Sequence, residues 1–290
     1  MKHLFWWVCL AIPFLFGCGA KKSSNTEEKT NANGTVTPAD TNVRIVPRYA
    51  KGFQVTYTDK GYCLLDIKDP QKEEGGESYH FALVPKGTKV TDAPEGYAVI
   101  ETPIKSTVCM TSLQLSNFIK LSALDAVVGI TSTRHLFNAD MQKRLKEGKT
   151  HKIGIEGNFD NEVIMGIHPD IILISPFKRG GYDALTEVGI PLIPHLGYKE
   201  MTPLGQAEWI KFVGLLIGQE AQANRIFAEI EKRYQELVQL TAQVKKRPVV
   251  FSGELRGGNW KEFLGPAVQG CGGRLFPEGG YTLGRGVARL

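Results

Sequence analysis

Cationic and aromatic side chains that lie beside short apolar runs are the residues of this sequence best suited to binding chemistry. Arginine and lysine pair with anions, and aromatic rings cover flat ring systems. The candidates for such contacts are Arg134, His135, Phe177, Lys178, Arg179, His195, Tyr198, Glu254, Arg256 and Trp260. Each one alone also fits a scaffold or surface role, so only the set is a prediction. His135 and His195 offer nitrogens for an axial metal bond, but no short histidine spacing supports a metal site.

Sequence motifs for catalysis or for cofactor binding are missing from the chain. It contains no G-x-S-x-G, H-E-x-x-H or P-loop pattern, and Gly154 and Gly157 do not complete a dinucleotide fingerprint. Five cysteines are too few for a disulfide scaffold, and none forms a C-x-x-C pair. Whether Cys63 and Cys109 pair stays open. We predict a binding protein without catalytic residues, cofactor or metal site.

The overall composition is that of a globular protein. The 290 residues are 42% hydrophobic and 22% charged, which excludes disorder along the whole length. The net charge of +5 is spread without a basic stripe, so charge gives no support to nucleic-acid binding.

The N-terminal segment has the features of a cleaved signal peptide. The apolar run Leu4–Phe16 has thirteen residues, fewer than the roughly 20 that span a bilayer. Leu15-Phe16-Gly17-Cys18 then resembles the bacterial lipobox. We predict removal of residues 1–17 and lipid attachment at Cys18, which several acyl chains would hold at a membrane. An uncleaved hydrophobic anchor is the alternative.

Residues 18–41 are predicted to form a flexible tether. Val36 is the single large aliphatic residue between Gly19 and Thr41, so this segment cannot bury enough surface to offset the entropy of ordering. A flexible coil of this length reaches roughly 25–30 Å. The tether would let a globular body work beside the membrane, outside the cytoplasm.

Residues 42–96 are predicted to form a small antiparallel β element. Apolar and polar residues alternate in three runs, and Asp59-Lys60-Gly61 provides a hairpin turn. The alternating apolar positions are Phe53, Val55, Tyr57, Tyr62, Leu64, Tyr79, Phe81 and Leu83.

Residues 97–202 are predicted to form a three-layer α/β lobe. Continuous apolar runs, typical of strands buried on both faces of a parallel sheet, alternate with helical stretches. The runs are 97–100, 126–130, 171–175 and 191–195, and the helices are 113–121, 138–147, 161–167 and 181–188. Ligand contacts are expected from loops that follow the carboxyl ends of the strands.

Residues 203–247 are predicted to form a long helical stretch with an interruption near Gly218. Apolar residues from Ala223 to Val244 recur at intervals of three and four. So long a connector between α/β blocks is unusual, because most connections are about 2–6 residues long. We predict an α/β protein in which one long helix joins two three-layer lobes, the second beginning at residue 248.

Several sequence blocks, in their order and spacing, resemble the substrate-binding lipoproteins of ABC importers for ferric siderophores, haem and cobalamin. Residues 97–100 and 124–131 resemble the first two strands of that family, and 162–174 resemble its block of glutamate, helix, lysine-proline-aspartate and strand. Residues 208–234 resemble its bridging helix. The resemblance extends from about residue 97 to 260. It implies two lobes that close over a ligand without catalysis.

The resemblance also implies a partner role for Glu162. A glutamate at this position in the family lies on the outer surface of the first lobe and pairs with arginines of the permease. A structural role is compatible with docking, because Asp160 fits as a helix N-cap and Glu162 complements the positive helix end. Pro169 and Asp170 are better explained by the end of a helix before a strand.

The function implied by the resemblance is that of an extracytoplasmic, lipid-anchored binding protein. It would capture a metal chelate or corrinoid and deliver it to an ABC permease and its ATPase. Siderophore, haem and cobalamin cargoes share this scaffold, so the ligand stays open, as does the membrane leaflet of the anchor. An extracytoplasmic sensor on the same lobes and an α/β lipoprotein enzyme are the alternative functions.

Residues 248–290 give a second lobe only forty-three positions, whereas about a hundred are expected. The segment 261–290 also changes character, because eight of its thirty residues are glycine and none is Asp, Asn, Ser or Ile. We interpret the second lobe as truncated, with a tail read in a shifted frame. A divergent, loop-rich end is the alternative. The other two reading frames of the gene test this interpretation, because family-like sequence should resume in one of them.

Overall fold

The computed structural model describes residues 43–245, apart from positions 73–74, 89–91, 132–135, 156–157, 177–181 and 188, and the strands 253–256 and 259–262. The predicted signal peptide, Cys18, the tether and most of the tail lie outside these residues. None of the helices in the described part of the chain combines the length and the hydropathy of a membrane span.

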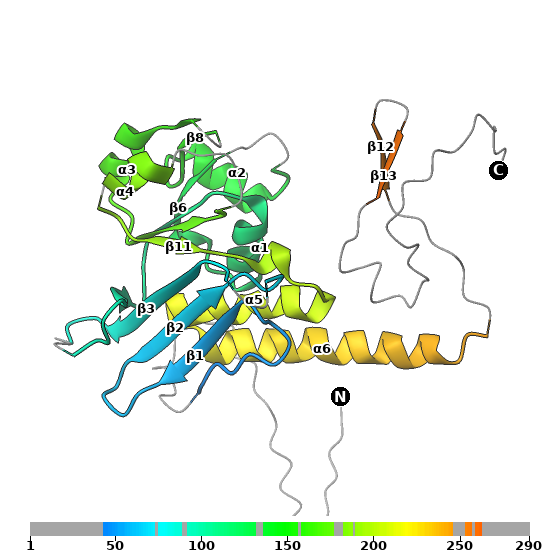
Figure 1. The fold of residues 1–290 in the computed structure, drawn as a ribbon. Helices are drawn as coiled ribbons and strands as arrows, with labels where there is room; N and C mark the ends of the chain where they lie inside the picture. The colour runs from blue at the N-terminus through cyan, green and yellow to red at the C-terminus, as the bar shows by residue number, and fades with distance from the viewer. Residues whose placement is uncertain are drawn as a thin grey trace, which may run out of the picture. The chain divides into compact units, whose positions relative to one another are not determined.

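The first sheet has four strands in the order β1-β2-β3-β4 (Figure 1). They are β1 (Phe53–Tyr57), β2 (Cys63–Lys68), β3 (Ser78–Pro85) and β4 (Ala98–Thr102). The first three pair antiparallel, as the alternation predicts, and Gly61 has a φ of +81° in the predicted turn.

The fourth strand corrects the sequence prediction, because β4 pairs parallel to β3. The apolar run at 97–100 therefore completes the first sheet and does not open the α/β lobe. Tyr97, at the start of this run, packs with Ala82 and Val84 over the same sheet. Sequence could not reveal this, because a short apolar run fits either sheet equally well.

The second sheet has five parallel strands in the order β11-β10-β5-β6-β7. They are β5 (Thr107–Cys109), β6 (Val127–Ile130), β7 (His151–Lys152), β10 (Ile171–Ile174) and β11 (Leu192–Pro194). Strands β6, β10 and β11 confirm three of the predicted runs. The central strand β5 has only three residues and was not predicted. A small antiparallel pair, β8 (Gly154–Ile155) and β9 (Asn158–Phe159), follows β7.

The helices between these strands agree with the predicted stretches to within two residues. They are α1 (Ser112–Lys120), α2 (Ala139–Lys146), α3 (Asn161–Ile167) and α4 (Tyr182–Glu187), with single turns η1 (Leu124–Ala126) and η2 (Gly197–Lys199). Thr111, Asn138 and Asp160 cap α1, α2 and α3 by accepting a hydrogen bond from a backbone N–H of the first turn.

The parallel sheet is covered on both faces, which confirms a three-layer α/β arrangement. Alternate residues of β10 belong to two different clusters. Ile171 and Leu173 pack in the cluster that contains Phe118 of α1, whereas Ile172 packs with Ile164 of α3. Burial on both faces explains the continuous apolar runs of these strands.

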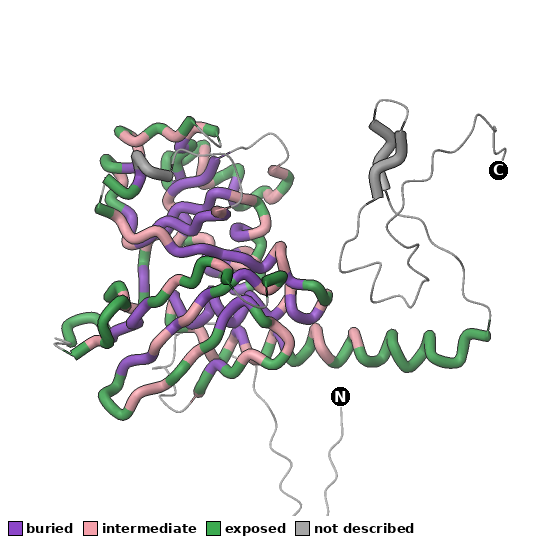
Figure 2. Tube along the Cα trace, viewed as in Figure 1, coloured by how far each residue is buried: buried purple, intermediate pink, exposed green. Residues whose placement is uncertain are grey.

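Two helices occupy the region predicted as one bridging helix, and they differ in role. Helix α5 (Pro203–Ile217) ends at Gly218, whose φ of +70° closes the helix as predicted, and α6 (Glu220–Ala242) follows. Helix α5 is apolar on almost every side and is buried between the two sheets, so it belongs to the core (Figure 2). Only α6 fits the prediction of a helix that leaves the lobe.

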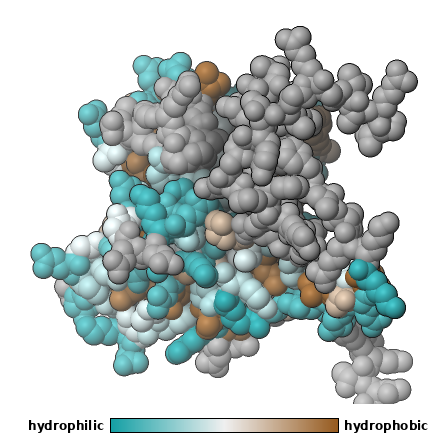
Figure 3. Space-filling model, turned by 45° about the vertical axis from the view of Figure 1, so that its right-hand side comes forward, coloured by the Kyte–Doolittle hydropathy of each residue, from teal (hydrophilic) through white to brown (hydrophobic). Residues whose placement is uncertain are grey.

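The second half of α6 is exposed along its apolar stripe. Phe227 is buried, whereas Leu237 and Leu240 are 61% and 73% exposed. Among the coloured residues of the face shown in Figure 3, hydrophilic ones predominate, and the apolar ones form separate patches. After α6 the structure describes one hairpin, of β12 (Gly253–Arg256) and β13 (Asn259–Glu262). Glu254, Arg256 and Trp260, for which we predict ligand contacts from loops, lie in the strands of this hairpin.

Candidate functional site

The carboxyl ends of β5, β6, β10 and β11 lie along one edge of the second sheet, because these strands are parallel. The segments that continue from them begin at Met110, Thr131, Ser175 and His195. This edge, called the carboxyl edge below, is where open α/β sheets bind ligands. The structure therefore brings together the starts of four loops of the kind from which the sequence analysis expects ligand contacts, because each follows the carboxyl end of a strand.

Half of the predicted contact residues cannot be placed along this edge. Arg134, His135, Phe177, Lys178 and Arg179 lie outside the described residues. Their loops begin at Thr131 and Ser175, which are buried at the ends of β6 and β10. The roles of the five side chains stay predictions.

His195 needs a correction, because its side chain is only 1% exposed. Its ring lies 4.7 Å from the ring of Trp209 and 5.7 Å from that of Phe212, both on α5. Burial lowers the pKa of His195 to about 4, so the ring is neutral near pH 7. A buried, neutral ring within the core is unsuited to direct ligand contact, and sequence reasoning missed this because the packing of the ring against α5 is a tertiary contact that no local pattern shows.

The remaining predicted contact residues lie in two places. Tyr198 is half-buried in η2 and packs against the main core. Glu254, Arg256 and Trp260 are in the hairpin, where Trp260 is opposite Leu255 and Arg256 is opposite Asn259.

A buried polar network joins the strand ends of the carboxyl edge. The Oε1 atom of Gln114 accepts hydrogen bonds from the N–H groups of Met110 (2.7 Å) and Thr111 (3.1 Å), and its Nε2 donates to Ser175 Oγ (3.3 Å). The hydroxyl of Thr131 donates to the carbonyl of Met110 at 2.8 Å. Sequence reasoning missed Gln114, although its place three residues after Thr111 is typical of a capping box.

Asn117, one helical turn after Gln114, reaches the fourth strand end. Its Nδ2 lies 3.1 Å from Nε2 of His195. Residues three apart lie on the same side of a helix, so α1 presents both amides to the carboxyl edge.

The opposite edge of the sheet is held by Asp170. Its Oδ2 accepts hydrogen bonds from the N–H groups of Lys105 (2.6 Å) and Ser106 (3.0 Å), and Lys86 Nζ lies 3.7 Å from Oδ1. Burial alone would raise the pKa of Asp170, but these hydrogen bonds and the lysine charge outweigh it, so the pKa lies below its usual value. Asp170 thus connects the start of β10 to the segment before β5.

Glu162 is exposed in the first turn of α3. The carboxylate of Asp160 accepts a hydrogen bond from Val163 N–H at 3.0 Å, so Asp160 is the predicted N-cap. Glu162 is therefore placed to complement the positive end of α3.

Cys63 and Cys109 are both buried and are not bonded to one another. Burial raises the pKa of Cys63 to about 12 and raises that of Cys109 as well, so both thiols stay protonated near pH 7. In the part of the chain that the structure describes, no three His, Cys, Asp or Glu residues are grouped to hold a metal ion.

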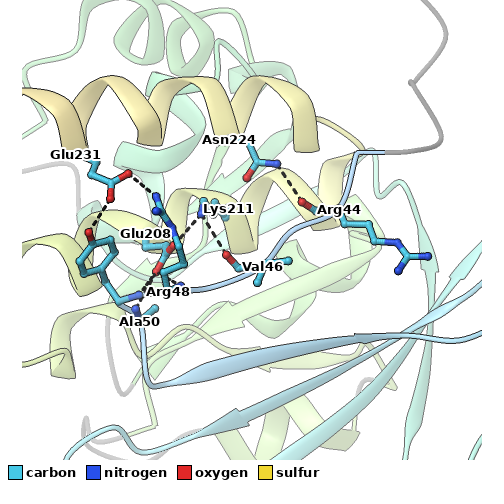
Figure 4. A network of polar contacts seen from close by, with 9 residues as sticks. Arg44, Val46, Arg48, Ala50, Glu208, Lys211, Asn224 and Glu231 are labelled. Atoms are coloured by element: carbon cyan, nitrogen blue, oxygen red, sulfur yellow. Dashed lines mark hydrogen bonds and ion pairs between the residues drawn. The ribbon is translucent and has the colours of Figure 1, made fainter.

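The segment 43–52, called the strap below, crosses α5 and α6 before it enters β1 (Figure 4). Glu208 Oε2 accepts hydrogen bonds from Arg48, Tyr49 and Ala50 N–H at 2.6–2.9 Å, and its Oε1 contacts Lys211 Nζ at 2.7 Å. Glu208 and Lys211 are both buried. The sequence gave no sign of this clamp, because its partners are about 160 residues apart.

Two further contacts secure the strap. Glu231 of α6 accepts from the side chains of Arg48 and Tyr49. Glu200 accepts from Gly52 N–H and from Trp209 Nε1, each at 2.9 Å. The strap thus fixes the first sheet to the core helix.

Two open grooves lie on the described surface. One of about 610 Å³ lies between the strap and the first sheet, with Lys51, Asp66 and His80 among its lining residues. The other, of about 320 Å³, lies beside α2 and includes Leu136, which follows His135 directly. Only the second groove includes a residue next to a predicted ligand contact.

A model of the periplasmic binding protein family matches residues 108–265, which is more than half of the chain. The chain belongs to the periplasmic binding protein family. A periplasmic binding protein from Veillonella parvula has the same fold, with a TM-score of 0.50 at 12% identity over 70% of this chain and 62% of its own. The family resemblance of the sequence is thereby confirmed.

Two curated relatives are uncharacterized lipoproteins of Methanocaldococcus jannaschii. They are 22% and 25% identical to this periplasmic binding protein over 81% of its length. The chain spans 61% of the length of each relative. Membership of the periplasmic binding protein family indicates an extracytoplasmic location.

Proposed function

We propose that this periplasmic binding protein captures a metal chelate or corrinoid at its carboxyl edge and delivers it to an ABC permease. The observation that carries this proposal is the convergence of four strand ends on one edge of a chain that belongs to this family. Two of these strands lead into the loops with the predicted cationic and aromatic residues.

The chemistry of those residues supports an anionic or flat ligand. Arg134, Lys178, Arg179 and Arg256 would pair with the negative groups of a ferric chelate, and Phe177, Tyr198 and Trp260 would cover a macrocycle. Several weak contacts of this kind would together favour the closed state of the two lobes, because a ligand shifts a protein toward the state in which it makes better contacts. Lipid attachment at Cys18 would hold the protein near its permease.

A titration of the full-length protein against four probes tests the proposal. The probes are a ferric hydroxamate, a ferric catecholate, haem and cobalamin, and binding is followed by tryptophan fluorescence and calorimetry. We expect saturable 1:1 binding of at least one probe, weakened in the double variant K178A/R179A. The control is Lys51→Ala, a lysine on the groove of the first sheet that should leave the affinity unchanged. If none of the four probes binds, the assignment of a metal chelate or corrinoid as the ligand is wrong.

Turnover separates binding from catalysis in the same experiment. Chemical analysis of the bound probe after long incubation should recover it unchanged. The enzyme alternative would be favoured if the probe were chemically modified and if mutation of one polar residue of the carboxyl edge abolished that modification.

A further inference from the structure

We propose that Gln114 is a positioning residue that sets the geometry of the ligand loops at the carboxyl edge. The inference rests on the proposed function, and it assigns to α1 a role beyond the packing of the lobe. It starts from the burial of Gln114, whose side chain has no exposed area. A buried amide must be satisfied by hydrogen bonds, because leaving its groups unpaired is costly.

The partners of Gln114 come from two different strand ends. Its acceptor holds the first two backbone N–H groups after β5, at Met110 and Thr111, and its donor holds Ser175 after β10. Thr131, the first residue after β6, is bonded to the carbonyl of the same Met110. One side chain and one neighbouring hydroxyl therefore fix three strand ends relative to one another.

Capping alone does not require this arrangement. A capping box needs the Gln114 acceptor and the Thr111 hydroxyl, both of which act on backbone N–H groups at the start of α1. The additional bond runs from Gln114, in the helix that follows β5, to Ser175, the first residue after the neighbouring strand β10. It is this crossing bond that couples the loop after β5 to the loop after β10.

The coupled residues are suited to positioning and not to direct contact. Ser175 is 2% exposed and Met110 is 4% exposed, so neither offers surface to a ligand. The predicted contacts follow at a short distance in sequence, with Arg134 three residues after Thr131 and Phe177 two residues after Ser175. A shift at the buried anchor would move Thr131 and Ser175, from which these loops start, and ligand contacts depend on such buried support.

Three variants separate positioning from stability. Ser175→Ala removes the crossing bond and keeps the capping box, whereas Gln114→Ala removes both. Gln114→Glu keeps an acceptor for Met110 and Thr111 and can accept from the Ser175 hydroxyl, so it should restore part of the function. The matched control is Thr202→Ala, which removes only the N-cap bond to Gly205 at α5.

The first measurement is the affinity for the probe that binds best to the wild-type protein. We expect binding about tenfold weaker in Ser175→Ala and weaker still in Gln114→Ala, because one lost buried hydrogen bond corresponds to about that factor. Gln114→Glu should recover affinity relative to Gln114→Ala. Thr202→Ala should lower the melting temperature without a change in affinity. Wild-type affinity in Ser175→Ala would overturn the inference while leaving the proposed function intact.

The second measurement needs no ligand. Hydrogen exchange should become faster at Met110 and Thr111 in Ser175→Ala, although the substituted residue is on another strand, and should be unchanged there in Thr202→Ala. If no probe binds, the proposed function fails, and exchange alone then decides whether Gln114 couples the loops. Unchanged exchange at Met110 and Thr111 in Ser175→Ala would refute the coupling.

Discussion

At the carboxylate of Asp170, two backbone N–H groups and one lysine meet on the edge of the sheet opposite the carboxyl edge. A carboxylate that satisfies backbone donors contributes more than an exposed ion pair does, because its loss leaves those donors unpaired. The pKa of Asp170 lies below its ordinary value. Its stabilising contribution is therefore present above the pKa of the unfolded state and is lost as the pH falls through the pKa of the folded state.

We predict that Asp170→Ala lowers the free energy of unfolding by about 1–3 kcal/mol, measured by urea denaturation. Lys86→Ala serves as the control, because it removes only the exposed partner at 3.7 Å and should cost less than about 1 kcal/mol. Equal losses in both variants would show that the ion pair, and not the backbone donors, is the main contribution.

The burial of His195 predicts a second pH dependence of the free energy of unfolding that arises from a single residue. Its pKa is about 4 in the folded state, against an ordinary value of 6.5, because the ring is buried beside Trp209 and Phe212. The unfolded state therefore binds a proton more readily, and His195 should reduce stability as the pH falls from 6.5 to 4, by about 3 kcal/mol in total.

Urea denaturation between pH 7 and pH 4.5 checks this dependence. In His195→Gln, which carries no titrating ring, the loss of stability on acidification should be smaller than in the wild type. Leu185→Ala is the control, because it lowers stability through a core cavity without removing a titrating group. The same slope in His195→Gln and in the wild type would contradict the assignment.

Helix α5 carries the strap through a buried ion pair. Glu208 accepts three strap N–H bonds and contacts Lys211, whose Nζ also lies 3.3 Å from the Val46 carbonyl and 4.4 Å from the Phe227 ring centre. A buried pair of this kind contributes little net energy as a pair, but removal of one partner leaves the other charge uncompensated. Glu208 and Lys211 differ in their other hydrogen bonds, because Glu208 accepts three from the strap and Lys211 donates one to it.

We predict that Glu208→Ala costs about 3–5 kcal/mol of stability, because it leaves Lys211 and three backbone donors unpaired. Lys211→Met should cost less, about 1–3 kcal/mol, because Glu208 keeps its three N–H bonds. Chemical denaturation of both variants gives the comparison. A larger loss in Lys211→Met would show that the lysine contacts hold the strap.

For the whole molecule, the exposed position of Glu162 leads to a prediction about uptake of the ligand. The residue is exposed on α3, and no contact of its side chain in the described lobe would compete with a partner. Docking to the proposed permease would use an exposed charged group of this kind.

We predict that Glu162→Lys leaves probe affinity within twofold of the wild type and lowers uptake by about tenfold in membrane vesicles that carry the cognate permease. Glu95→Lys is the control, because Glu95 is an exposed carboxylate beside the first sheet and should not affect uptake. Normal uptake by Glu162→Lys, or an equal loss in Glu95→Lys, would exclude Glu162 as a docking residue.

Local pattern was enough to predict most elements of the lobe. The helix cap at Asp160, the break at Gly218 and the apolar runs of β6, β10 and β11 are properties of neighbouring residues. The same local information was insufficient for β5, which has three residues, and for β4, whose apolar run fits either sheet.

The sequence by itself determined the α/β class and the family to which the chain belongs. Both depend on local features, namely the periodicity of apolar residues in strands and helices and the order and spacing of the family-like sequence blocks. Only the tertiary structure decided that His195 is buried, that Gln114 reaches Ser175 and that Glu208 holds the strap. These roles join residues 61 to 160 positions apart or depend on packing against α5. Burial and hydrogen bonding between distant segments arise when the chain closes on itself, and no local period encodes them.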